Sequence, residues 1–61
     1  MQVGDFVEKV GGDYDFGGYI VAAFTKLAGE KRYIVENEDR ILHIFSEKNL
    51  RVLHSWPEEN K

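Results

Sequence analysis

The chain has 61 residues, of which 43% are hydrophobic and 31% are charged, a composition typical of one small folded domain and not of a disordered chain. Eight lysine and arginine residues stand against eleven aspartate and glutamate residues, and the net charge of −3 disfavours nucleic acid as a partner. Because there is no cysteine, disulfides and thiolate metal sites are excluded.

The sequence carries no signal for a membrane or for export. No apolar run approaches the roughly 20 residues that cross a bilayer. The first residues also lack the basic and apolar blocks of a signal peptide. We therefore expect a cytoplasmic protein with no membrane partner.

Strand signals dominate the chain, because segments rich in β-branched and aromatic residues alternate with glycine-rich or polar turns. Five strands are predicted: Phe6–Val10, Tyr19–Lys26, Arg32–Glu36, Ile41–Phe45 and Arg51–Leu53. The stretch Gly11–Gly18 is too rich in glycine for a helix and predicts a loop, while Ser46–Leu50 predicts a single helical turn. This order predicts an all-β fold, a small five-stranded SH3-like barrel over residues 1–53, followed by a C-terminal tail over 54–61.

Two features of the C-terminal third have alternative interpretations. A helix over Ile41–Leu53 competes with the strand prediction, but its apolar positions lose the 3.6-residue period across Glu47–Asn49, so the strand is favoured. The tail contains Trp56 and is either a frayed end or a segment that folds back onto the domain.

The predicted strand Ile41–Phe45 is apolar on both faces. Alternation places Leu42 and Ile44 on one side and Ile41, His43 and Phe45 on the other. A domain of this size has one interior, so something else must cover the second face. The chain's own tail is one candidate, but we favour a second copy of the chain, with copies of His43 and Phe45 near a symmetry axis.

Several segments together resemble one known family. They are Gly4–Lys9, Phe16 in the glycine-bounded loop, Ile20–Val21, Tyr33–Glu36, Leu42–Phe45 and Leu50. From about Gly4 to Val52 the chain resembles the plasmid-borne, trimethoprim-insensitive (type B) dihydrofolate reductases. The resemblance implies an SH3-like barrel that assembles as a homotetramer, with NADPH and dihydrofolate, a pteridine, meeting in one central pore.

The resemblance also implies roles for individual residues. His43 and Phe45 would stand at the catalytic positions, where stacked rings are held so that a hydride passes between them and orientation supplies most of the rate. Backbone groups of Leu42 and Ile44 would hold the nicotinamide, with His43 beside it. Lys9 would attract the phosphates of NADPH.

The chain departs from the family motif at two of these positions, and the sequence leaves open whether it is an enzyme. His43 replaces a glutamine, and Phe45 replaces a tyrosine and lacks its hydroxyl. The alternative is a non-catalytic barrel that binds a peptide or protein partner through the acidic and aromatic Tyr14–Phe16 loop. His43 and His54 lack carboxylates at useful spacing, so no metal site is predicted.

Overall fold

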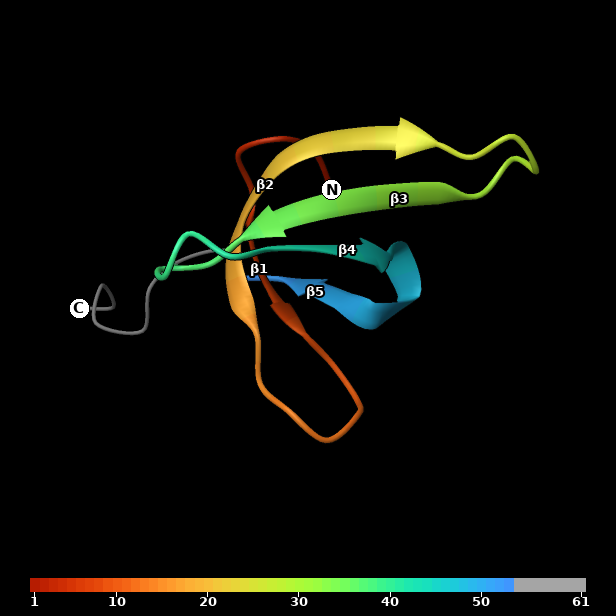
Figure 1. The fold of residues 1–61 in the computed structure, drawn as a ribbon. Coiled ribbons are helices and arrows are strands. Elements are labelled where there is room, and N and C mark those ends of the chain that lie inside the picture. The colour runs from red at the N-terminus through yellow and green to blue at the C-terminus, as the bar shows by residue number, and fades with distance from the viewer. Residues whose placement is uncertain (54–61) are drawn as a thin grey trace.

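The computed structural model of the protein describes residues 1–53 (Figure 1). Its elements are β1 (Phe6–Lys9), β2 (Gly17–Thr25), β3 (Lys31–Glu36), β4 (Leu42–Ser46), the 3-10 helix η1 (Glu47–Asn49) and β5 (Leu50–Val52). The predicted all-β fold, with five strands and a helical turn before the last strand, is confirmed. The alternative of a helix over Ile41–Leu53 is wrong, and the tail with Trp56 lies outside the described residues.

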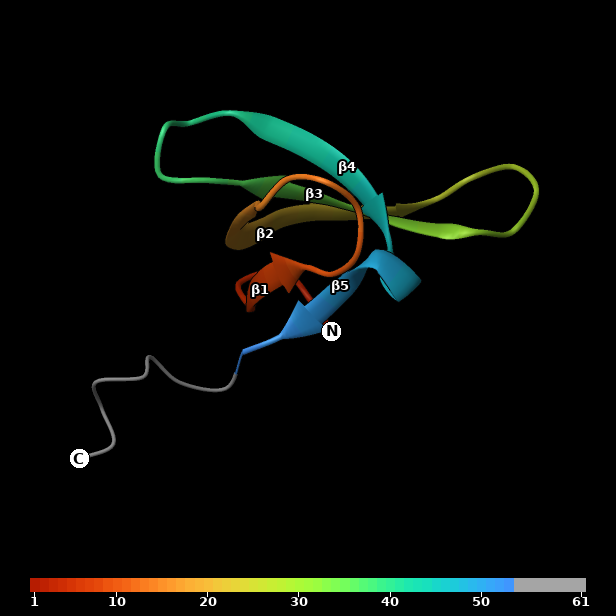
Figure 2. The same cartoon turned by 90° about the horizontal axis from the view of Figure 1, so that it is seen from below.

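The strands form one antiparallel sheet in the order β4-β3-β2-β1-β5. The sheet bends strongly, helped by a register shift between Ile20 and Ala22 in β2. In Figure 2 the loop from β1 to β2 runs between β4 and β5. These two edge strands do not pair with each other, so the sheet of this SH3-like barrel is open along one side.

Six buried side chains form the core on the inner face of the bent sheet: Val7, Ile20, Tyr33, Val35, Phe45 and Leu50. Cross-strand pairing joins them, because Ile20 of β2 lies opposite Val35 of β3, and Tyr33 lies opposite Phe45 of β4. Met1, Phe16 and Val52 pack against this cluster and are partly buried. The core therefore draws on every strand, which ties the whole sheet to one small interior.

The strand β2 begins two residues earlier than predicted, at a pair of glycines that approach neighbouring backbone closely. A Cβ atom on Gly18 would lie 2.0 Å from the carbonyl oxygen of Glu36 and 2.9 Å from the Cα of Asn37. Because no side chain fits in that space, only glycine allows β2 to run this close to the end of β3.

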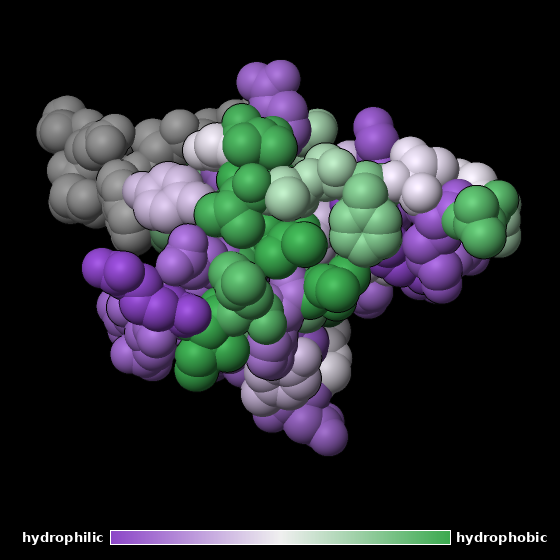
Figure 3. Space-filling model, turned by 45° about the horizontal axis from the view of Figure 1, so that its top comes forward, coloured by the Kyte–Doolittle hydropathy of each residue, from purple (hydrophilic) through white to green (hydrophobic). Residues whose placement is uncertain are grey.

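The outer face of the sheet carries exposed apolar side chains. Leu42 and Ile44 of β4 are 56% and 59% exposed, and Val21 and Phe24 of β2 are also exposed. Figure 3 looks onto this side of the molecule, where apolar surface gathers in the centre. Within residues 1–53, the face of β4 that no other segment covers is therefore the one with Leu42 and Ile44.

Candidate functional site

The two residues that the family resemblance assigns to catalysis lie on the inner side of the sheet. Phe45 is 7% exposed and belongs to the core. His43 lies opposite Val35 and is partly buried. The chain's own core covers Phe45, and the β1–β2 loop covers part of His43, while the association of copies at this strand stays a prediction.

An aromatic stack holds the β1–β2 loop against β4. The rings of Phe16 and His43 are parallel within 8°, with centroids 4.3 Å apart. Phe16 also contacts Phe45, at 5.5 Å between centroids, and the ring of Tyr14 meets His43 edge-on at 6.1 Å. The Tyr14–Phe16 segment therefore packs on the open side of the sheet, and its aromatic rings contact His43.

The ammonium group of Lys9 is held by the same loop. Its Nζ atom donates hydrogen bonds to the carbonyl oxygens of Gly11 and Tyr14 and lies 4.3 Å from the centre of the Tyr14 ring. A cation over an aromatic face is attracted by the ring electrons. In this conformation Lys9 stabilises the loop that follows β1.

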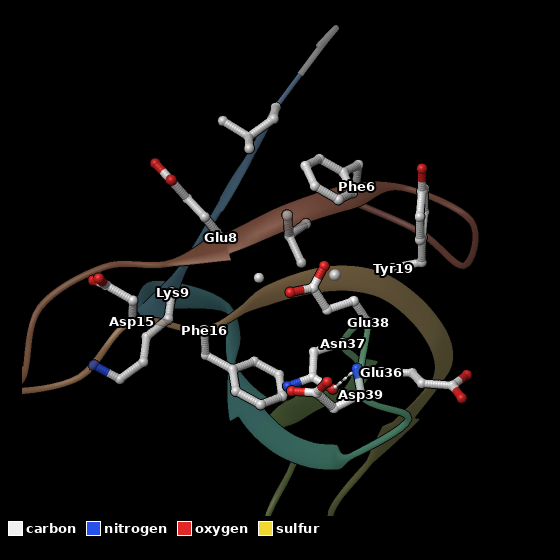
Figure 4. A pocket seen from close by; sticks show the side chains of 14 residues that line it. Phe6, Glu8, Lys9, Asp15, Phe16, Tyr19, Glu36, Asn37, Glu38 and Asp39 are labelled. Carbon is white, nitrogen blue, oxygen red and sulfur yellow. Dashed lines mark hydrogen bonds between the residues drawn. The ribbon is translucent and has the colours of Figure 1, made fainter. Parts of the chain in front are cut away.

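A pocket of about 650 Å³ lies between the β1–β2 edge and the turn after β3 (Figure 4). It is lined by Phe6, Val7, Glu8, Lys9, Asp15, Phe16, Gly17, Gly18, Tyr19, Glu36, Asn37, Glu38, Asp39 and Leu53. Gly17 and Gly18 contribute only backbone to the lining, and Phe6 and Tyr19 form an aromatic pair with centroids 4.9 Å apart. The volume lies within the range of about 300–1,000 Å³ that is usual for ligand sites.

The turn that faces this pocket is organised by Asn37. Its Oδ1 atom accepts hydrogen bonds from the backbone N–H groups of Asp39, at 2.9 Å, and Ile41, at 3.0 Å. Arg40 completes the turn with a positive φ of 66°, a backbone conformation that is uncommon for residues other than glycine, asparagine and aspartate. Figure 4 shows the carboxyl groups of Glu38 and Asp39 on the turn side of the pocket, whereas Glu36 points away from it.

The charge of the pocket is strongly negative. Its described lining has five acidic residues, Glu8, Asp15, Glu36, Glu38 and Asp39, and one basic residue, Lys9, and of the acidic side chains Glu36 points away from the pocket. Glu8 is paired with Arg51 on β5. Within residues 1–53 no ion pair uses Asp15, Glu38 or Asp39. The pocket thus combines aromatic surface with carboxylates that lack a salt-bridge partner in the described chain.

Of the residues singled out from the sequence, the pocket brings together Lys9 and the Asp15–Phe16 part of the loop, while Leu42 and Ile44 point away to the outer face. Phe6 and the acidic turn were not predicted from the sequence as pocket residues. The signals were present as the Gly17–Gly18 pair and the run of acidic residues after β3, but only strand pairing shows that they meet.

Comparison of the chain with models of protein families, with curated proteins and with solved structures gives no match. The resemblance to the type B reductases therefore stays a prediction, and function has to be argued from the site itself. Within residues 1–53 no three histidine or acidic side chains converge in the way that a metal ion needs. In the same range no helix has the length and hydropathy of a membrane span.

Proposed function

We propose that this protein is a small non-catalytic binding module that takes a basic side chain of a partner peptide or protein into the pocket between β1, β2 and the turn after β3. The observation that carries the proposal is the combination of unpaired carboxylates and aromatic rings around one cavity. Arginine and lysine combine an apolar stem with a charged head, and such a cavity suits both parts.

The geometry gives each part of the pocket a role. The Phe6–Tyr19 pair offers apolar surface to the stem of the bound side chain. Glu38 and Asp39 on the turn side offer carboxylate oxygens to its charged end. A guanidinium is the better match, because its planar fork of donors can bind two carboxylate oxygens at once.

The test is a titration of the full chain with the acetylated and amidated peptide Gly-Pro-Arg-Pro-Gly, followed by NMR. We expect shifts of the Phe16, Gly17 and Gly18 amide resonances, with a dissociation constant on the order of 0.1–1 mM, as suits one anchoring side chain. The matched peptide carries citrulline, which has nearly the shape of arginine without its charge, and should bind at least about tenfold more weakly.

Two variants test whether the turn carboxylates supply the affinity. Glu38→Gln should weaken the arginine peptide about threefold to fivefold, because one charge of the pocket is lost. Glu47→Gln makes the same substitution on η1, outside the pocket, and should leave affinity unchanged. Equal binding of the citrulline peptide, or equal loss in both variants, would contradict the proposal.

The reductase is a second candidate function, supported by the sequence resemblance and by one structural observation. Leu42 and Ile44 are exposed on an edge strand, so other copies of the chain can reach the segment that the family uses to line its pore. Against it, Phe45 is part of the core and would have to leave it to contact a ligand.

Kinetics and mass separate the two functions. For a binding module we expect no NADPH oxidation with dihydrofolate above background, and no change of the His43 resonances on addition of NADPH. Oxidation that persists in trimethoprim, by a species of four chains in sedimentation, would establish the reductase and its NADPH site instead.

A further inference from the structure

The outer face of β2, β3 and β4 has an apolar centre that the described chain leaves exposed. Its middle row runs across the sheet through Ala22, Ile34 and Ile44, which lie opposite one another in the strand register. Leu42 and Ile44 are more than half exposed, and Val21 and Phe24 extend the apolar area along β2. Contiguous apolar surface of this kind on a small domain marks an interaction surface more often than scattered single residues do.

Charges flank this apolar row in a regular way. On β3, Arg32 lies two residues before Ile34 and Glu36 lies two residues after it, and all three positions share the outer face. The face is therefore positive on one side of its centre and negative on the other.

The polarity continues beyond the strand at both ends. At the β2–β3 hairpin Lys26 and Arg32 share one carboxylate, that of Glu30, at 3.6 Å and 2.8 Å. At the opposite end of β3 three carboxylates, from Glu36, Glu38 and Asp39, stand against Arg40 alone. The hairpin end thus carries a positive excess and the opposite end a negative excess.

We propose that this face binds a second copy of the chain, with a twofold axis near Ile34. A twofold axis places the same patch on both sides of an interface, so each residue meets its counterpart across the axis. With the two β3 strands antiparallel, Arg32 of one copy lies against Glu36 of the other on both sides of the apolar centre. The charge pattern is complementary to itself in this arrangement, whereas a parallel arrangement would bring like charges together.

The size of the face sets the expected strength. Three strands, about 4.8 Å apart and some six residues long, give an interface on the order of 400–500 Å² per copy, because protruding side chains make the accessible surface larger than the flat area of the sheet. That area lies at the lower end of specific interfaces, so we expect a weak dimer with a dissociation constant on the order of 10–100 μM. The dimer does not rest on the pocket proposal, because its ion pairs use Arg32 and Glu36. Glu36 also lines the pocket, but its side chain points away from it.

Sedimentation equilibrium of the full chain tests the dimer. We expect a mass approaching two chains at about 1 mM protein, and weaker association when ionic strength rises from about 0.05 M to about 0.5 M. Ile44→Asp should weaken association at least tenfold, since it puts a charge in the apolar centre. Leu27→Asp is the matched control, because Leu27 is an exposed leucine at the hairpin tip and away from the centre, and it should leave the mass unchanged.

Charge exchange tests the twofold register itself. Arg32→Glu and Glu36→Arg should each be monomeric, because each sets like charges against each other in a homodimer. An equimolar mixture of the two variants should dimerise again, since both ion pairs form between unlike copies. A wild-type monomer at about 1 mM overturns the proposal, and so does a mixture of folded variants that stays monomeric. Circular dichroism shows whether each variant is folded.

Discussion

Replacing Phe45 with alanine should unfold the domain at room temperature. Phe45 is buried in the core opposite Tyr33, and removal of a buried phenylalanine costs about 3–5 kcal/mol. A core of this size supplies no more than roughly 3–5 kcal/mol of net stability, so the variant has little or none left. Far-ultraviolet circular dichroism and the dispersion of the amide NMR spectrum measure the loss.

The neighbouring residue provides the control for Phe45. Ile44→Ala removes an apolar side chain of the same strand that points outward, and in dilute solution it should cost less than about 1 kcal/mol. A folded Phe45→Ala variant, or equal effects at both positions, would show that Phe45 does not belong to the core. Such a result would favour an exposed position for the Phe45 ring, as the reductase resemblance implies.

Gly18→Ala should lower the stability by about 2–3 kcal/mol and the melting temperature by roughly 10–20 °C. The added Cβ would meet the Glu36 carbonyl oxygen at 2.0 Å, and the obstacle is backbone, which cannot swing aside as a flexible side chain can. β2 and the end of β3 must therefore move apart.

Gly17→Ala is the matched substitution one residue earlier. There the added atom would lie 3.3 Å from the Val7 carbonyl oxygen, a tight contact that a shift of a few tenths of an ångström relieves, so the loss should stay below about 1 kcal/mol. Thermal denaturation followed by circular dichroism compares the two variants. Similar melting temperatures for the two would contradict the close approach at Gly18.

The strands were predictable because local chemistry determines them. β-Branched and aromatic residues stand between glycine or polar turns, and every predicted strand appears with ends shifted by at most two residues. The start of β2 was placed late because glycine has a low strand preference, and its reason for being there is the close approach of Gly18 to Glu36.

The inward face of β4 was not predictable from its own residues. Both sides of Leu42–Phe45 are apolar, so alternation alone does not show which side faces the core. What decides between them is the register with β3, where Tyr33 is opposite Phe45, and the loop residue Phe16, which stacks on His43. Both contacts join residues far apart in the sequence.

The pocket could not be predicted from the sequence for a related reason. Its lining includes Gly17 and Gly18 of β2, the aromatic pair of Phe6 and Tyr19 on two strands, and acidic residues of the turn after β3. The loop near Phe16 was singled out for its acidic and aromatic composition, and it does contribute two lining residues. The partner elements follow only from the order of the strands.

The open side of the sheet has a consequence for how the domain fluctuates. Among the strands of residues 1–53, β4 hydrogen-bonds to a neighbour on one side only, so it can detach without complete unfolding of the domain. The stack of His43 on Phe16 and the insertion of Phe45 into the core oppose that excursion. Amide hydrogens of β4 should therefore exchange with solvent faster than those of the central strands β2 and β3. The contacts of His43 and Phe45 determine the rate at which β4 opens.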